Sequence, residues 1–355
     1  MKLNRRELRQ GPQVISTLAI GCLTAIGTGA LAQDSSDGIT ELTVVDREQV
    51  GNLPTGPLSV VIEHDPGLAT HTIYRPGALT LNDHPVLVWG EGGCANNGLM
   101  FPEYLSEIAS YGFVVIADGP PGSVGAGAGG PNGAAARGGG PPPAGAAAGG
   151  PPPGAGPAGG RGGRGGAPGG GGPANPGGMV NGTDLIAAID WLEAEASDRG
   201  SRFYNKVDVD NVAAMGMSCG GLMSYGASAD PRVATIGIWN SGLFPDEANE
   251  ALYNGINGSV IIVTGGESDI AYANGKRDFE DMPAGVPVFY GVYPSVGHGG
   301  TYNQDNGGPY GIAAVAWLKW QLQGDTSESG RGYFVGDDCV ICADENWEID
   351  SRSLR

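Results

Sequence analysis

Short apolar runs recur along the chain, and each has the length of one buried strand. Turn residues and amphipathic stretches separate them. The predicted strands are 85–89, 113–117, 209–217, 234–239, 259–264 and 287–293. Two earlier runs, 58–64 and 70–74, are expected to pair antiparallel at one edge of the same sheet.

Apolar residues at helical spacing fall between these strands and predict helices over 102–110, 181–198 and 310–322. In the last helix we expect Ile312 to pack inward, together with Val315, Trp317 and Leu318. Because strands and helices alternate, the pattern predicts an α/β fold. Its sheet should be mostly parallel and covered by helices on both faces.

One long segment, 120–178, has no hydrophobic pattern and consists almost only of Gly, Pro and Ala. Such a composition buries too little apolar surface to offset the entropy of ordering, so we expect disorder. The segment divides the predicted folded domain into 33–119 and 179–325, and a tail, 326–355, follows. The insertion is either a tolerated repeat expansion or a flexible arm that contacts a polymer or surface.

The first 32 residues have the pattern of an export signal. A basic start precedes an apolar run, 14–30, and Ala30-Leu31-Ala32 offers a cleavage site. Glycines interrupt the run, so we expect no stable membrane span. Arg5 and Arg6 leave twin-arginine export open beside ordinary secretion. The pattern predicts a secreted or periplasmic protein.

The chain is strongly acidic, with a formal net charge of −19. The leader carries four basic residues and one acidic residue, so cleavage would leave −22. Such a charge argues against nucleic acid, polyphosphate and anionic membranes as partners. The sequence does not determine the oligomeric state.

The motif Gly216-Met217-Ser218-Cys219-Gly220 follows a predicted strand and precedes a helical stretch. A strand that runs into Gly-x-Ser-x-Gly and then a helix is the nucleophile elbow typical of α/β-hydrolases. Ser218 is therefore the candidate nucleophile. It needs a base and an orienting carboxylate, which in α/β-hydrolases follow in the order acid, then histidine.

His298 is the one histidine after Ser218 and lies in a glycine-flanked loop beyond a predicted strand. It is the candidate base. Asp269, just past the end of strand 259–264, is the preferred acid. Other acidic residues nearby are Glu267, Asp278 and Asp281.

An oxyanion hole needs two backbone N–H donors. One is expected from Cys219, the residue after the nucleophile. The other is expected from the Gly-rich loop after strand 85–89, at Glu91, whose side chain should face away from developing negative charge. Trp239 and Tyr272 follow strands close to these residues and either line the substrate site or serve packing.

Several segments resemble secreted α/β-hydrolases of the dienelactone-hydrolase, chlorophyllase and polyester-hydrolase neighbourhood. They are HTIYRP (71–76), PVLVWGEGGCANNG (85–98), ASYGFVVIADG (109–119), GMSCGG (216–221), GGESDIAYANG (265–275), GHGGTY (297–302) and AWLKWQLQGD (316–325). The resemblance implies the α/β-hydrolase fold and the triad Ser218, Asp269 and His298. Glu91, where an uncharged residue is expected, and the insertion depart from the family.

Beyond the leader the chain has four cysteines, which allow three pairings. Cys94 and Cys219 lie in loops expected to converge on the same oxygen, so we predict that they are bonded. Cys339 and Cys342 would then form a small ring in the tail. The alternative for this second pair is half of a zinc site, but no further Cys pair or nearby histidine supports a metal.

Together these features predict a secreted serine hydrolase that cleaves carboxylic esters, either small molecules or polymers, without a cofactor. Two alternatives stay open. The same triad could hydrolyse amides or peptides, or the fold could be a catalytically inactive binding module.

Overall fold

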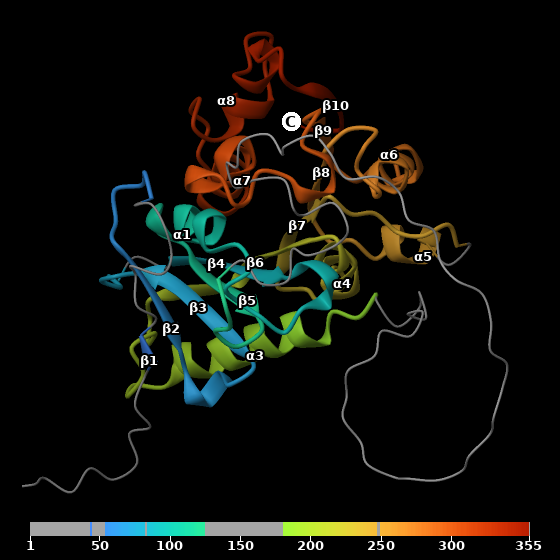
Figure 1. Ribbon diagram of the computed structural model, residues 1–355. Helices are drawn as coiled ribbons and strands as arrows, with labels where there is room; N and C mark the ends of the chain where they lie inside the picture. The colour runs from blue at the N-terminus through green and yellow to red at the C-terminus, as the bar shows by residue number, and fades with distance from the viewer. Residues whose placement is uncertain (1–42, 45–53, 82–83, 125–179, 247–248, 355) are drawn as a thin grey trace, which may run out of the picture. The chain divides into compact units, whose positions relative to one another are not determined.

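The computed structural model describes residues 43–44, 54–81, 84–124, 180–246 and 249–354. Within these residues one sheet of ten strands has the order β1-β2-β3-β5-β4-β6-β7-β8-β9-β10 (Figure 1). The strands are β1 Thr43–Val44, β2 Val60–His64, β3 His71–Pro76, β4 His84–Gly90, β5 Val114–Asp118, β6 Val207–Met217, β7 Val233–Trp239, β8 Ser259–Thr264, β9 Val288–Val292 and β10 Glu348–Arg352. The helices are α1 Pro102–Ser110, α3 Thr183–Ser197, α4 Cys219–Ala227, α5 Asn249–Asn254, α6 Tyr272–Asp281, α7 Gly308–Gln323 and α8 Arg331–Phe334.

The centre of the sheet is parallel and its edges are antiparallel. In the run β5-β4-β6-β7-β8-β9, each strand pairs in parallel with the next one. At one side β1, β2 and β3 are antiparallel, and β3 also pairs antiparallel with β5. The predicted α/β class, the mostly parallel sheet and the antiparallel first strands are therefore confirmed.

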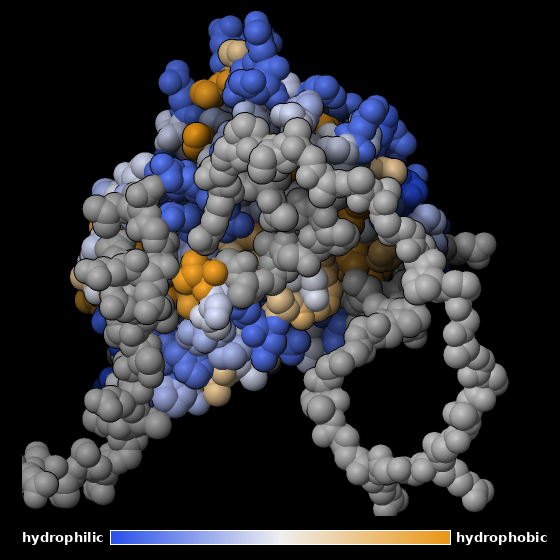
Figure 2. Space-filling view, viewed as in Figure 1, coloured by the Kyte–Doolittle hydropathy of each residue, from blue (hydrophilic) through white to orange (hydrophobic). Residues whose placement is uncertain are grey.

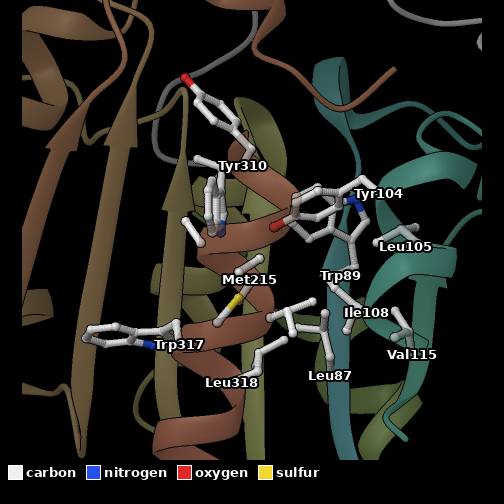
Figure 3. Close-up of a cluster of buried hydrophobic side chains, with 14 of the residues drawn as sticks. Leu87, Trp89, Tyr104, Leu105, Ile108, Val115, Met215, Tyr310, Trp317 and Leu318 are labelled. Atoms are coloured by element: carbon white, nitrogen blue, oxygen red, sulfur yellow. The ribbon is translucent and has the colours of Figure 1, made fainter. Parts of the chain in front are cut away.

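Helices cover both faces of the sheet, so its central strands are buried on both sides. Alternate residues of each strand point to opposite faces, as in Leu87 and Val88 of β4. One face packs against α1 and α7, where Leu105, Ile108 and Leu318 are fully buried (Figure 3). The other face packs against α3, α4 and α6.

Helix α7 differs from the expectation at one position. Its buried stripe runs through Tyr310, Ala314, Trp317 and Leu318 at helical spacing. Ile312 falls outside this stripe and is 58% exposed. The expectation that it packs inward was therefore wrong.

The sheet extends beyond the boundary expected at residue 325. Strand β10 pairs antiparallel with β9 and forms the last strand of the sheet. Trp347, just before β10, is 7% exposed and packs edge-on against Tyr293, with ring centroids 5.1 Å apart. The segment 326–355, expected to be a tail, therefore completes one edge of the fold.

The predicted leader, 1–32, and most of the predicted insertion lie outside the described residues. The start of the insertion is described as far as Val124. There the Asn97 side chain accepts a hydrogen bond from the Gly122 N–H and donates one to the Ser123 carbonyl. These bonds fix the first residues of the segment against the loop after β4.

Hydrophilic residues cover much of the coloured surface in Figure 2, and hydrophobic residues gather in separate patches. The exposed large apolar side chains of the described residues include Phe244, Ile270 and Ile349. No helix in the described part of the chain has the length and apolar character needed to cross a bilayer.

The role of the C-terminal segment can be tested with Trp347→Ala. Because Trp347 is buried against Tyr293 and Tyr310, its truncation should lower the free energy of unfolding by about 3–5 kcal/mol, measured by urea denaturation. Ile349→Ala, at a position 37% exposed on β10, is the control and should change it by less than about 1 kcal/mol. A Trp347→Ala effect as small as that of the control would show that the segment contributes little to the fold.

Candidate active site

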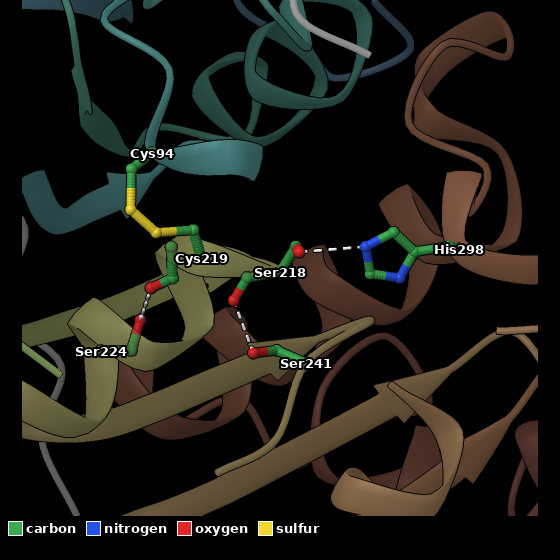
Figure 4. Close-up of a disulfide and its surroundings, with 7 residues drawn as sticks. Cys94, Ser218, Cys219, Ser224, Ser241 and His298 are labelled. Atoms are coloured by element: carbon green, nitrogen blue, oxygen red, sulfur yellow. Dashed lines mark hydrogen bonds between the residues drawn. A yellow bond between two sulfur atoms is a disulfide. The ribbon is translucent and has the colours of Figure 1, made fainter. Parts of the chain in front are cut away.

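Ser218 occupies a strained turn between β6 and α4, with φ 54° and ψ −112°. Its backbone N–H donates to the Trp239 carbonyl at 2.9 Å, and the Ser241 hydroxyl donates to the Ser218 carbonyl at 2.6 Å (Figure 4 shows the Ser241 bond). A Cβ at Gly216 or Gly220 would collide with the backbone opposite. The glycines of the motif therefore let the turn close and leave the Ser218 side chain projecting from it.

His298 and Asp269 complete a continuous hydrogen-bonded chain with Ser218. The Ser218 Oγ lies 2.9 Å from the His298 Nε2, and the His298 Nδ1 lies 2.6 Å from the Asp269 Oδ1 (Figure 4 shows Ser218 and His298). The three residues follow β6, β9 and β8, whose carboxyl ends share one edge of the parallel sheet. The structure therefore brings together all three residues predicted from the sequence.

The other acidic candidates lie elsewhere. Glu267 and Asp281 are exposed. Asp278 is buried, but its carboxylate accepts hydrogen bonds from the Tyr225 and Tyr253 hydroxyls and from the Leu243 N–H. Among the candidates, Asp269 is the one that the structure pairs with His298.

The Asp269 carboxylate is buried, and every polar contact to it comes from a donor. The backbone N–H groups of Gly265 and Ala271 donate to it at 3.0 Å and 2.9 Å, and the Asn240 amide donates at 2.8 Å. Burial alone would raise the pKa of Asp269. These donors and His298 outweigh burial and hold that pKa below its ordinary value, so the group stays anionic at neutral pH.

Asn240 is a residue of this site that the sequence analysis missed. It follows β7 directly, is fully buried and has a left-handed backbone with φ 43°. The sequence does contain one signal for it, an asparagine directly after a predicted strand. Asparagine is among the few residues that tolerate a left-handed backbone. The residues that its side chain would contact could not be read from the pattern.

The loop after β4 approaches Ser218 from the opposite side to His298 (Figure 4). Glu91 caps the short helical turn Gly92–Cys94, and Cys94 pairs with Cys219 with their Cα atoms 5.2 Å apart. As the first residue of α4, Cys219 has a backbone N–H without an acceptor inside the helix. The structure contains the predicted disulfide between Cys94 and Cys219, and this bond lies next to the candidate nucleophile.

The Glu91 side chain is fully buried and points into the core. Its Oε2 accepts a hydrogen bond from the Trp89 indole at 3.1 Å, and its Oε1 has no partner within the described residues. Burial raises the pKa of Glu91 well above its ordinary value of 4.5, so the carboxyl keeps its proton as the pH rises past that value. A neutral Glu91 side chain adds no net negative charge to the core at this position.

The two residues named as lining candidates differ in position. Trp239 has no exposed surface, and its indole packs against the rings of Tyr104 and Tyr310. It therefore serves packing rather than lining. Tyr272 is half-buried at the start of α6, shortly after Asp269.

The second cysteine pair, Cys339 and Cys342, has its Cα atoms 5.1 Å apart and is also bonded. Because the two sulfurs are bonded to each other, they do not form the half of a zinc site considered as the alternative. Within the described residues, no group of three His, Cys, Asp or Glu side chains is placed to hold a metal ion.

No protein-family model matches the chain, and no curated protein matches it.

The disulfide at the site should control the reactivity of Ser218. In Cys94→Ala/Cys219→Ala the loop after β4 loses its covalent link to α4, so the two expected oxyanion donors, the Cys219 and Glu91 N–H groups, lose their fixed separation. We expect phosphonylation by a fluorophosphonate, followed by mass spectrometry, to slow on the order of 100-fold, the usual effect of losing one such donor. Cys339→Ala/Cys342→Ala is the matched control and should react at the parent rate. Equal rates in all three proteins would contradict this role.

Glu91 should make stability depend on pH. The unfolded chain releases the Glu91 proton above pH 4.5 while the folded protein retains it, so folding becomes less favourable as the pH rises. Glu91→Gln removes this dependence and keeps an acceptor for Trp89. The free energy of unfolding of Glu91→Gln should equal that of the parent near pH 4. Above pH 4 the variant should exceed the parent by a margin that grows by up to about 1.4 kcal/mol per pH unit.

Urea denaturation at pH 4, 6 and 8 checks this expectation. Glu348→Gln, at an exposed position on β10, is the control and should show no such trend. A Glu91→Gln gain that does not change between pH 4 and pH 8 would mean that Glu91 is ionised in the folded protein.

Proposed function

We propose that the protein is a serine hydrolase of the α/β-hydrolase fold that cleaves carboxylic esters. The observation that carries the proposal is the hydrogen-bonded chain from Ser218 through His298 to Asp269. Its residues occur in the order serine, acid, histidine, which is the order in α/β-hydrolases. The central position of the strand before Ser218 and the sequence resemblance also support this fold.

In the first half of the reaction, the Ser218 Oγ attacks the ester carbonyl carbon while the His298 Nε2 accepts the serine proton. The carbonyl oxygen becomes an oxyanion, and the backbone N–H groups of Cys219 and Glu91 donate to it. Collapse of the tetrahedral intermediate breaks the bond to the alcohol, which takes the proton from His298. An acyl group then remains on Ser218.

In the second half, a water molecule attacks the acyl carbonyl and His298 accepts its proton. Collapse returns that proton to Ser218 and releases the carboxylic acid. Asp269 stays anionic throughout, since its donors hold its pKa low, and it stabilises the imidazolium. No cofactor enters these steps.

The proposed substrate is an uncharged or weakly charged ester, either a small molecule or a polymer. The acidic chain argues against nucleic acid as a partner. Both cysteine pairs are bonded, which is compatible with an oxidising compartment. We therefore propose that the protein acts outside the cytoplasm, as a secreted or periplasmic enzyme.

Ser218→Ala tests the proposal. Without the nucleophile, hydrolysis of p-nitrophenyl acetate and butyrate should fall by several orders of magnitude, measured as kcat/KM on protein shown to be folded. Ser197→Ala, at an exposed position ending α3, is the control and should match the parent. Turnover of Ser218→Ala within tenfold of the parent would exclude Ser218 as the nucleophile. Faster cleavage of a matched p-nitroanilide would favour an amide hydrolase.

A further inference from the structure

The residues at the end of β7 contact both the Ser218 turn and the pair formed by Asp269 and His298. The Trp239 carbonyl accepts the Ser218 N–H, and the Ser241 hydroxyl donates to the Ser218 carbonyl (Figure 4 shows the Ser241 bond). Asn240, between these two residues, points instead to the acid and the histidine loop. Its amide Nδ2 lies 2.8 Å from the Asp269 Oδ2 and 3.1 Å from the Gly297 carbonyl oxygen.

The orientation of the Asn240 amide is fixed by its partners. The Tyr302 hydroxyl donates to the Asn240 Oδ1 at 2.6 Å. Asp269 and the Gly297 carbonyl can only accept, so the amide nitrogen must face them. A flipped amide would set its oxygen against a carboxylate and a carbonyl and lose all three bonds. Tyr302 therefore helps to keep the Asn240 donor aimed at Asp269.

The two Asp269 oxygens have separate partners. Oδ1 faces the His298 Nδ1 and accepts the Ala271 N–H, whereas Oδ2 accepts from the Gly265 N–H and from Asn240. Holding Oδ2 fixes the rotation of the carboxylate and so directs Oδ1 at the imidazole. The Gly297 contact also ties Asn240 to the residue before His298.

We propose that Asn240 is a positioning residue that sets the geometry between Asp269 and His298, and that Tyr302 orients it. This inference rests on the proposed function and deepens it. Asn240 is fully buried and its bonds go to the acid and to the histidine loop, so it acts through these residues and not on the substrate. Its removal should therefore lower kcat and leave KM within about twofold.

Two substitutions separate this role from a purely structural one. Glycine and aspartate both tolerate the left-handed backbone at this position, whose N–H donates to the Val263 carbonyl at 2.7 Å. Asn240→Gly removes the donor and the side-chain volume. Asn240→Asp keeps the volume but, once ionised, removes the donor and sets a second carboxylate against Asp269.

We expect Asn240→Gly to lower kcat by about 10- to 100-fold, a part of what general base catalysis usually contributes. In Asn240→Asp, a protonated carboxyl can still donate to Asp269, whereas an ionised one sets a like charge against it. We therefore expect the kcat of Asn240→Asp to fall relative to that of Asn240→Gly as the pH rises from about 6 to about 9. If Asn240 only fills space, aspartate is the better replacement at every pH, and a constant advantage of Asn240→Asp over Asn240→Gly across this range would overturn the proposal.

A spectroscopic measurement keeps the test independent of ester turnover. In the parent, the His298 Nδ1 proton in its short bond to Asp269 should give a far-downfield ¹H NMR resonance, assigned by its absence in His298→Ala. That resonance should disappear or move upfield in Asn240→Gly. Should the parent hydrolyse no ester, the proposed function fails, yet loss of the resonance would still support the positioning role.

Tyr302→Phe tests the orienting step with little change in volume. It should lower kcat in the same direction as Asn240→Gly, by a smaller factor, and weaken the same resonance. Tyr253→Phe is the matched control, since it removes a buried tyrosine hydroxyl that bonds Asp278 instead. It should leave both readouts at parent values. An unchanged resonance together with kcat within twofold in Tyr302→Phe and Asn240→Gly would overturn the proposal.

Discussion

The strained turn at Ser218 is the constraint on which the rest of the site depends. A non-glycine residue at φ 54° and ψ −112° is held in a sparsely populated conformation, which costs on the order of 1–3 kcal/mol. The turn persists because Gly90, Gly216 and Gly220 let two strands and a helix approach without side chains between them. Bonds from the end of β7 and the disulfide at Cys219 hold the same turn from other sides.

The acid and histidine are held by a different principle, the satisfaction of buried polar groups. A carboxylate as buried as Asp269 is stable only when donors surround it, and here backbone N–H groups and one amide fill that need. The aromatic cluster beneath them, which includes Trp239, Tyr302 and Tyr310, excludes water from this network (Figure 3 shows Tyr310). The packed aromatic core therefore supports the hydrogen bonds that hold Asp269 and His298 at the sheet edge.

Much of this could be predicted because the signals are local. The strand 259–264 and the helix 102–110 have strong hydrophobic patterns, and the structure reproduces both ranges. The three triad candidates followed from chain order and from the position of strand ends. Strand β10 was missed because its exposed, charged residues carry no apolar pattern, and it forms only by pairing with β9. Asn240 was missed because its role depends on contacts with Asp269 and Tyr302, which are distant in sequence.

The central claim is that Ser218 carries the acyl group during turnover. The most direct measurement is acid quenching of the parent protein within the first turnover of a slowly deacylated p-nitrophenyl ester, followed by intact-mass and peptide analysis. The account predicts a burst of about one p-nitrophenolate per chain and a mass increase of one acyl group on the peptide that contains Ser218. Continued ester turnover with the acyl group on another residue, or with no acylated protein under conditions that show a burst, would contradict it.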